Sequence, residues 1–406
     1  GTADLTLTHA STAVSGSSDA ITLGVLNATG GVFNAAGIET LTIDSTLTAS
    51  TLSDVVATDL TTLKVTGSAN LSVTDEDNNI DFATNSATEA AAIDGTVDAS
   101  AFTGNLDILF NTGDVISATG GSGSDTFNFT TGFDKYDVVD GGAGTDTLVI
   151  SQGAATLTKT ELANVTNVET LAINTTSDSA VLNADGIDSS ISTIKTAANT
   201  ILVDIDSTLG SAGNNITYVL NGTTYTIATA GATQDVDTIG AELAASITAI
   251  DGFTASTTAV DATTDGVLVT ATTGDVVNIS AVTEVGIAAI TTVYGDMDNI
   301  SVTNIVGQTL EIGSGKNVTA SLKDASGTAD TLNINLTSNS VDKAIDQTIA
   351  QISAANIETI NLNTSGLSAN TVDYIVTTFT DGGSTDLTTL NITGSSSLDL
   401  SLMVVS

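Results

Sequence analysis

The chain has 406 residues, which is long enough for about two to four domains with substantial cores. It contains no cysteine and no proline, so disulfide frameworks, thiol catalysis and cysteine metal sites are excluded. Its 47 acidic residues against seven lysines give a net charge of −40, which makes nucleic acid and anionic membranes poor partners and divalent cations good ones.

The acidic excess does not indicate a disordered chain. Charged residues are only 13% of the total, the mean hydropathy is +0.29, and Thr, Ser, Ala, Val, Ile, Leu, Asn and Gly fill the sequence. This composition is typical of extended β-structure with turns, and adaptation to salt is an alternative explanation of the charge.

Features of membrane insertion and export are few. No apolar run is long enough to span a bilayer, so we expect no transmembrane segment. No signal peptide is visible, and Gly1 is not a natural initiator, so we expect a processed or excised chain. The export route stays open, and the pattern is compatible with secretion by an uncleaved carboxy-terminal signal.

A unit of two phrases recurs three times along the chain. The copies are "GIETLTI" at 37–43 with "DLTTLKVTGS" at 59–68, "NVETLAI" at 167–173 with "SISTIKTAAN" at 190–199, and "NIETINL" at 356–362 with "DLTTLNITGS" at 386–395. Apolar and polar residues alternate in each phrase, which predicts half-buried strands. Spacings of about 20 to 30 residues suit one coil of a solenoid. We therefore predict a mainly β fold, a parallel β-solenoid or β-roll with irregular coils.

Chance matches in a Thr-rich sequence are the alternative explanation of these repeats. The phrases at 59–68 and 386–395 are identical at eight of ten positions, which makes chance a poor account of them.

The acidic segment "DEDNNID" offers oxygen ligands at alternate positions, as calcium loops do. These candidate metal ligands are Asp75, Asp77, Asn79 and Asp81. The segment differs from an EF-hand because Ile80 replaces the glycine at the sixth position and Ser86 replaces the glutamate at the twelfth. A solvated turn is the alternative to an irregular calcium site.

The pattern G-G-x-G-x-D-x-apolar-x occurs twice, at 120–128 and at 141–149. Glycine permits sharp turns and close approach of the backbone, so carbonyl groups and the aspartate can point at one spot. Hard oxygen donors arranged in this way favour Ca²⁺. The following apolar residues, Phe127 and Leu148, are expected to fill the interior. The candidate metal-site residues are Gly120, Gly121, Gly123, Asp125, Gly141, Gly142, Gly144 and Asp146.

This pattern resembles the RTX family of calcium-binding repeats. Asp137 precedes Asp146 by nine residues, the repeat length of that family, so it fits a flanking half-repeat and joins the candidate ligands. The resemblance implies a β-roll in which Asp125 and Asp146 lie on one edge, one rung apart. The chain departs from the family in lacking an uninterrupted tandem array, and ordinary Gly-Asp turns between strands are the alternative.

Residues 201–290 break the solenoid pattern. Tyr218–Leu220 and Tyr225–Ile227 flank Asn221 and Gly222, a strong hairpin signal. Apolar residues at helical spacing follow, with Asp235 or Asp237 available as the N-cap and Gly252 as the stop. The apolar helix positions are Val236, Ile239, Leu243, Ile247 and Ile250. A second pair of strands completes an inserted α+β module of hairpin, helix and hairpin.

Sequence motifs for catalysis are scarce. The chain has no H-E-x-x-H, no G-x-S-x-G and a single histidine, His9. Paired carboxylates of the glycosidase type stay open, but an aromatic content of 3% argues against a cleft that stacks sugars. We therefore predict that the chain is not an enzyme.

The coil phrases, together with "KDASGTADTLNI" at 323–334 and "GTDTLVI" at 144–150, resemble calcium-dependent surface-layer proteins of Gram-negative bacteria exported by type I secretion. The resemblance implies an extracellular structural subunit that self-assembles into a lattice on the cell surface, with Ca²⁺ as its ion and a cell-surface polysaccharide as a candidate anchor. The alternative is a fragment of a secreted RTX adhesin or biofilm matrix protein.

The expected domain organisation follows from these segments. It consists of β-solenoid coils at 1–110, an RTX-like calcium-binding β-roll segment at 111–150, further coils at 151–200, the inserted α+β module at 201–290 and final coils at 291–406.

Overall fold

The chain forms two compact units. Unit 1 comprises Gly1–Gln152, Thr156–Ile173 and Asn183–Ile194, and unit 2 comprises Gly153–Ala155, Asn174–Leu182 and Lys195–Ser406. The computed structural model describes residues 5–7, 14, 16–52, 54–57, 59–73, 80, 82, 92–110, 114–129, 132–152, 156–175, 179–198, 200–205, 215–220, 223–228, 236–248, 250, 253–258, 266–271, 279–284, 290–294, 299–312, 317–337, 347–349, 351–365, 373–380, 387–400 and 404–405.

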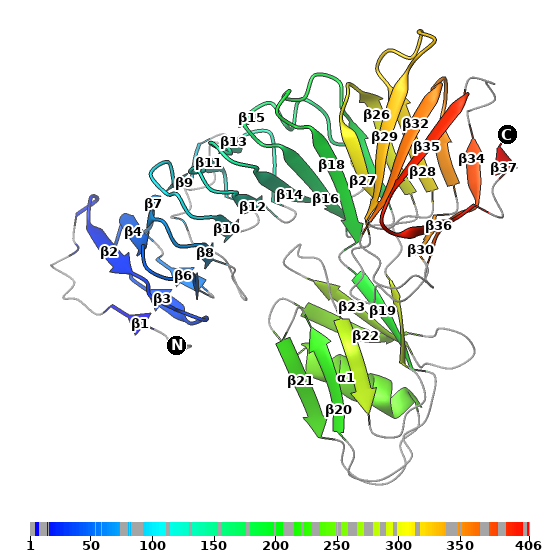
Figure 1. The fold of residues 1–406 in the computed structure, drawn as a ribbon. Helices are drawn as coiled ribbons and strands as arrows, with labels where there is room; N and C mark the ends of the chain where they lie inside the picture. The colour runs from blue at the N-terminus through cyan, green and yellow to red at the C-terminus, as the bar shows by residue number, and fades with distance from the viewer. Residues whose placement is uncertain are drawn as a thin grey trace. The chain divides into compact units, whose positions relative to one another are not determined.

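Unit 1 is built from short parallel strands that stack coil upon coil (Figure 1). One row is β15-β13-β11-β9-β7-β4-β2 and the facing row includes β16-β14-β12-β10-β8-β5. The first row comprises β2 (Ala20–Gly24), β4 (Thr40–Ser45), β7 (Thr62–Gly67), β9 (Gly95–Asp98), β11 (Ile116–Thr119), β13 (Val138–Asp140) and β15 (Val165–Thr166). The facing row comprises β5 (Ser50–Leu52), β8 (Leu71–Val73), β10 (Leu106–Leu109), β12 (Thr126–Asn128), β14 (Thr147–Gln152), β16 (Thr170–Thr175) and then β18 (Thr193–Ala198). A short third row contains β1 (Leu5–Thr6), β3 (Val32–Asn34) and β6 (Asp54–Val56).

Unit 2 repeats this architecture with longer coils. Figure 1 shows β29, β32 and β35 side by side, in parallel. One row comprises β27 (Thr309–Ile312), β29 (Thr331–Thr337), β32 (Thr359–Ser365) and β35 (Thr389–Gly394). A second comprises β17 (Ser179–Asn183), β26 (Asn299–Ile305), β28 (Asn317–Leu322), β31 (Gln351–Ala354), β34 (Thr378–Thr380) and β37 (Val404–Val405). A third comprises β30 (Gln347–Ile349), β33 (Asp373–Val376) and β36 (Ser397–Asp399). The predicted parallel β-solenoid is confirmed.

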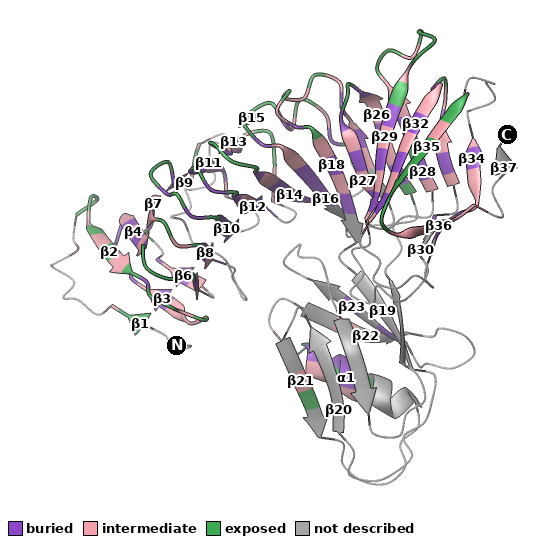
Figure 2. Ribbon diagram, viewed as in Figure 1, coloured by how far each residue is buried: buried purple, intermediate pink, exposed green. Residues whose placement is uncertain are grey.

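Alternation of side chains explains why these phrases form strands. In β4, residues alternate between half-buried and buried, with Leu41 and Ile43 fully inside. Successive side chains of a strand point to opposite faces, so one face of each coil fills the interior. The parallel register places Leu41 beside Leu63 and Leu63 beside Val97, which builds a continuous apolar column. Figure 2 shows buried and half-buried segments alternating along several strands. Each coil thus buries its apolar face against its neighbours.

The inserted module has antiparallel strands and the helix predicted for it. The hairpin pairs Tyr218 with Tyr225, and the helix α1 spans Val236–Thr248. Leu243 and Ile247 of α1 are buried. The strands are β19 (Thr200–Ile205), β20 (Asn215–Leu220), β21 (Thr223–Ala228), β22 (Phe253–Thr258), β23 (Gly266–Ala271), β24 (Ile279–Glu284) and β25 (Ile290–Tyr294).

Two further observations concern helices. Within the described part of the chain, α1 is the single helix. No helix found there has the length and apolar character needed to cross a membrane.

Stability measurements test the position of the core. Leu362 of β32 and Ile392 of β35 are register partners, but Leu362 is 0% exposed and Ile392 is 49% exposed. We expect Leu362→Ala to lower the free energy of unfolding by about 2–5 kcal/mol, because it removes buried methyl groups and leaves a cavity. Ile392→Ala should cost about 1 kcal/mol or less. Urea denaturation of dilute protein measures both, and equal losses would contradict this placement of the core.

Candidate functional site

Carboxylates link successive coils at the point where strands begin. Among the described residues, a carboxylate oxygen accepts the backbone N–H of the matching residue on the preceding coil in several places, including Asp59 and Asp137. We call the five such acids that directly precede a threonine at the start of a strand the acidic ladder. The bonds run from Asp19 N to Glu39 (2.6 Å), Leu106 N to Asp125 (2.8 Å), Asp125 N to Asp146 (2.7 Å), Asp146 N to Glu169 (2.7 Å) and Asp330 N to Glu358 (2.8 Å). Bonds from N–H to an ionised acceptor are stronger than neutral ones, so the ladder ties coil to coil.

The recurrent "E-T" phrases acquire a structural explanation from this ladder. Each glutamate of these phrases is followed by the threonine that begins a strand, and the residue two positions before the glutamate has a positive φ. That residue gives the turn its left-handed bend, which glycine and asparagine tolerate best. The positive-φ residues are Gly37 (72°), Asn167 (52°) and Asn356 (56°). The buried residues between them and the acids are Ile38, Val168 and Ile357.

Asp125 and Asp146, the two aspartates of the glycine-rich repeats, lie on adjacent rungs of this ladder. Phe127 and Leu148 pair with each other and are fully buried, as the pattern predicts. Asp125 is 1% exposed, and both of its oxygens accept backbone N–H groups, from Leu106 (2.8 Å) and Gly121 (2.7 Å). Its carboxylate is therefore hydrogen-bonded on both sides.

Asp146 differs from Asp125 in one respect that matters chemically. It is 0% exposed, and its Oδ1 accepts the N–H of Asp125. Its Oδ2 is buried and has no hydrogen-bond partner in the structure. An ionised oxygen without water or a donor is costly, since burial of a charge must be offset by pairing. A positively charged group or a hydrogen-bond donor at Oδ2 would therefore stabilise the ionised form of Asp146.

The glycines of these turns are required by close stacking. A Cβ on Gly120 would lie 2.1 Å from the carbonyl oxygen of Gly141 and 2.6 Å from Asp125 Oδ2. A Cβ on Gly141 would lie 1.9 Å from the carbonyl oxygen of Asn167 and 2.7 Å from Asp146 Oδ2. The space above each glycine is therefore bounded by a carboxylate oxygen and a carbonyl oxygen of the next coil.

These donors fit a hard cation. All are oxygens, the class that Ca²⁺ prefers, and Asp146 Oδ2 is an unpartnered member of the set. Among the described residues no group of three or more acidic, His or Cys side chains is arranged to hold a metal. A cation here would therefore depend on carbonyl oxygens beside the carboxylates of Asp125 and Asp146. The residues that would hold it are Asp125, Asp146, Gly141 and Asn167, the last two through their carbonyl groups.

The structure separates Asp137 from the other two aspartates. Asp137 precedes β13, which belongs to the opposite row of strands, and it is 1% exposed. Its oxygens accept the N–H groups of Ile116 (2.8 Å) and Asp134 (2.7 Å). It is thus a cap of the facing turns. Gly142 and Gly144 adopt positive φ in the second repeat, and Gly121 and Gly123 contact the preceding coil.

The second predicted calcium segment lies outside the described residues. This applies to Asp75, Asp77, Asn79 and Asp81. Pattern reading also missed Glu169 as a neighbour of the site, although an acid before the first threonine of a strand is a signal that would have found it.

Burial shifts the protonation of these aspartates. Burial raises the pKa of Asp146 to about 6, with the negative charges of Asp125 and Glu169 adding to the increase. Burial likewise raises the pKa of Asp137 to about 6. It raises the pKa of Asp125 too, against the hydrogen bonds from Leu106 and Gly121. The turns thus hold negative charge at neutral pH at an energetic cost.

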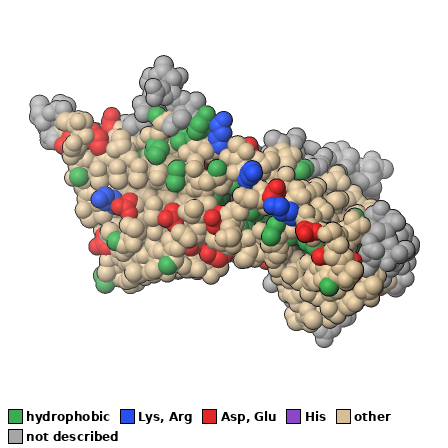
Figure 3. Space-filling model, turned by 90° about the horizontal axis from the view of Figure 1, so that it is seen from above, with side chains coloured by type: hydrophobic (Ala, Val, Ile, Leu, Met, Phe, Trp, Pro, Cys, Tyr) green, Lys and Arg blue, Asp and Glu red, His purple; other side chains and the backbone are tan. Residues whose placement is uncertain are grey.

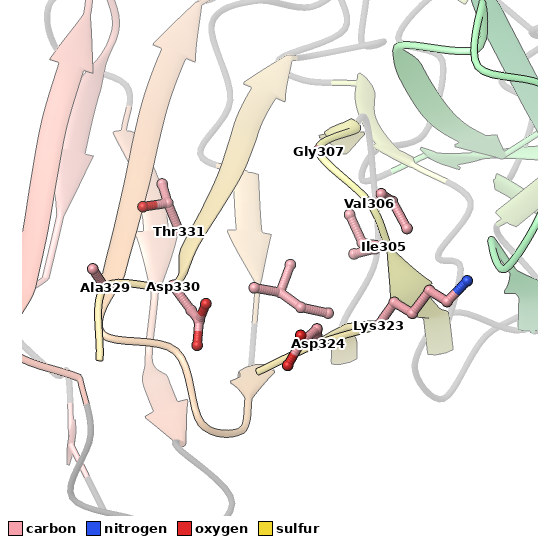
Figure 4. Close-up of a pocket in the computed structure, with 9 residues that line it drawn as sticks. Ile305, Val306, Gly307, Lys323, Asp324, Ala329, Asp330 and Thr331 are labelled. Atoms are coloured by element: carbon pink, nitrogen blue, oxygen red, sulfur yellow. The ribbon is translucent and has the colours of Figure 1, made fainter. Parts of the chain in front are cut away.

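A separate pocket of about 750 Å³ lies in unit 2 between the end of β28 and the start of β29 (Figure 4). Ile305 and Leu322 contribute apolar surface, and Lys323, Asp324 and Asp330 contribute charge. Figure 4 shows the Lys323 side chain pointing away from the two aspartates. This pocket has mixed chemistry and does not include the glycine-rich turns.

Comparison with known proteins adds no relative. No protein family, curated protein or solved structure matches the chain. Its function must therefore be inferred from its own residues.

Substitution of a glycine tests the stacking of the turns. We expect Gly120→Ala to lower the free energy of unfolding by about 1–3 kcal/mol or more, because its Cβ would overlap the Gly141 carbonyl. The control is Gly24→Ala in β2, where no atom lies within 4 Å of the added Cβ. It should be neutral or slightly stabilising. Thermal melting compares the two, and a harmless Gly120→Ala would refute the stacked turn.

The raised pKa of Asp146 predicts an unusual pH dependence without metal. The folded state binds this proton more tightly than the unfolded state, in which the pKa of the carboxyl group is 3.8. Protonation of Asp146 therefore adds fully to the stability of the folded state below pH 3.8, and this contribution is lost as the pH rises through about 6. In chelator, Asp146→Asn should therefore gain stability relative to the unsubstituted protein between pH 4 and 7, by on the order of 2 kcal/mol. Denaturation of both proteins at pH 4 and at pH 7 measures this gain. If the stability of the two proteins changed equally with pH, the prediction would be wrong.

Proposed function

We propose that the chain is a structural surface-layer subunit that assembles outside a bacterial cell into a calcium-dependent array. The observation that carries the proposal is the buried, unpartnered oxygen of Asp146 inside a stack of glycine-rich turns. In a repeating solenoid that contains such a position, a bound cation would stabilise the stacked coils. Export by type I secretion and a polysaccharide anchor are part of the same proposal.

Calcium would act on the electrostatics of the turns. Asp125, Asp146 and Glu169 bring three carboxylates onto consecutive rungs, where the charges of Asp125 and Glu169 raise the cost of ionising Asp146. A divalent cation held by Asp125, Asp146 and nearby carbonyl groups would offset this repulsion at neutral pH. Since the unfolded chain has no such arrangement, ion binding would stabilise the folded coils.

The surface supports a role in assembly. Asp and Glu side chains are scattered among neutral side chains over the face seen in Figure 3, with a few lysines. With a net charge of −40, copies repel one another at low ionic strength, and divalent cations reduce this repulsion. Calcium would therefore promote association as well as folding.

Electron microscopy of the purified chain, titrated with Ca²⁺ and with Mg²⁺ at equal ionic strength, tests the proposal. Ordered sheets that form only with Ca²⁺ and dissolve on chelation support the surface-layer subunit. Particles that become compact in Ca²⁺ but stay single favour the RTX adhesin or matrix protein instead. A chain that responds to neither ion refutes both.

A matched pair of variants tests the calcium site itself. Asp146→Asn and Glu358→Gln each neutralise one acid of the ladder that accepts a single backbone N–H, at 2.7 Å and 2.8 Å. At a calcium concentration of about 100 times Kd, the unsubstituted protein should gain about 2.7 kcal/mol. Glu358→Gln should retain this gain and Asp146→Asn should lose most of it. Calorimetry with and without Ca²⁺ measures the gain, and equal gains in both variants would show that calcium acts elsewhere.

A further inference from the structure

The outer face of one sheet in unit 2 carries a regular series of amide and hydroxyl side chains. The strands β27, β29, β32 and β35 lie side by side in parallel (Figure 1), and alternate residues of β27, β29 and β32 are buried. Successive side chains of a strand point to opposite faces, so the intervening residues lie on the outer face. We call the outer face of these four strands the amide face. Its asparagines are Asn333, Asn335, Asn361, Asn363 and Asn391.

The asparagines of the amide face stand in columns that run from coil to coil. The register places Asn333 beside Asn361, Asn361 beside Asn391, and Asn335 beside Asn363. The amide of Asn391 donates to Asn361 Oδ1 and that of Asn361 donates to Asn333 Oδ1, each at 2.8 Å. These bonds fix the amide groups before any partner binds, which lowers the entropic cost of binding.

An amide within such a column can still bind a partner. An asparagine side chain has two N–H donors and two acceptor lone pairs. Asn361 uses one donor toward Asn333 and one lone pair toward Asn391. One N–H and one lone pair of Asn361 therefore remain. Equivalent groups recur along a column at the spacing of neighbouring strands, about 4.8 Å. The matching partner offers donors and acceptors at the same period.

A second copy of the amide face has this period, because it is built from the same strands. Two identical columns stay in register along their length, whereas a polymer with a different repeat loses register after a few coils. Asparagine ladders are a recognised feature of sheets that pack face to face. The four strands contain no aromatic residue on which a sugar ring could stack. A second copy is therefore favoured over a polysaccharide.

The charge of the amide face permits two copies to approach each other. Glu311 is the single ionisable residue in the four strands. Its carboxylate lies 3.4 Å from Lys195 Nζ, so the pair has no net charge. In a chain with a net charge of −40, copies repel one another, and contact through a face without net charge adds little to this repulsion.

The position of Glu311 selects one orientation of the two copies. A two-fold axis parallel to the strands, between β29 and β32, sets Asn333 of each copy opposite Asn361 of the other. It separates the two Glu311 side chains laterally by three strand spacings, about 14 Å. This exceeds the screening length of about 8 Å at physiological ionic strength. A two-fold axis across the strands, between the two columns, would reduce the lateral separation to about 7 Å.

We propose that two copies of this chain associate through the amide face, by a two-fold contact centred between β29 and β32. The contact is isologous, so it closes at a dimer. The inference rests on the proposed assembly function, of which it specifies one contact. Four strands of up to seven residues present about 20 Å by 23 Å in each copy. The dimer would thus bury about 900 Å² in total, the size of a weak interface.

Sedimentation velocity of the full chain in chelator, at concentrations up to about 1 mM, tests the contact. The unsubstituted chain should form dimers and nothing larger. Asn363→Asp should raise the dissociation constant about tenfold or more, because it buries an unpaired charge in each copy. The control is Ser353→Asp, which adds the same charge at a half-buried residue of β31, in another row of unit 2, and should dimerise normally.

Two results of this experiment would overturn the proposal. One is an unsubstituted chain that stays monomeric at every concentration, and the other is equal weakening by Asn363→Asp and Ser353→Asp. Equal melting temperatures of the dilute proteins confirm that both variants remain folded.

Chemical cross-linking locates the contact independently. The chain has no cysteine, so a single introduced thiol is unique. With a short bis-maleimide reagent, Asn363→Cys should give a covalent dimer and Ser353→Cys should remain monomeric. Equal yields of dimer from the two variants would contradict the proposed face.

A neutral polysaccharide on the amide face is the competing outcome. Native electrophoresis through a gel that contains dextran detects it as slower migration of the chain. If dextran retards a monomeric unsubstituted chain but does not retard Asn363→Asp, the face binds a sugar polymer and the proposed dimer is wrong.

Failure of this inference is distinguishable from failure of the proposed function. If Asn363→Asp forms calcium-dependent sheets as readily as the unsubstituted chain, the inference fails and the proposed function stands. If the dimer forms equally in chelator and in Ca²⁺ and no sheets appear with either, the contact stands and the proposed function fails.

Discussion

The parallel stacking of coils is the constraint on which the rest of the structure depends. Each coil buries its apolar residues only because the next coil lies in register upon it, as Leu41, Leu63 and Val97 do. Backbone hydrogen bonds hold this register along the strands, and the acidic ladder holds it at the turns. A carboxylate suits the turn because it accepts a backbone N–H that the strand ladder does not use.

The acidic ladder also brings negatively charged side chains of successive coils close together. Coils stack at the spacing of neighbouring strands, so acids at the same position of successive coils lie close together. In the glycine-rich turns the coils stack closely, and one buried oxygen of Asp146 has no hydrogen-bond partner. The same geometry that secures the coils therefore generates a position where a bound cation would be stabilising. Elsewhere, as at Glu358, the ladder is present without the glycine-rich turns.

Much of the fold was predictable from local pattern. Alternating phrases, their repetition and the hairpin and helix signals of the inserted module each depend on nearby residues, and all were recognisable in sequence. The resemblance to calcium-binding repeats also implied that Asp125 and Asp146 lie on adjacent rungs. Three features depend instead on how coils stack across 20 or more residues. These are the oxygen of Asp146 without a hydrogen-bond partner, the position of Asp137 in the opposite turns, and the proximity of Glu169 to the site. Two nearly identical phrases show the limit most clearly: Val65 is buried and Ile392 is exposed because burial is decided by the next coil, which only the tertiary structure reveals.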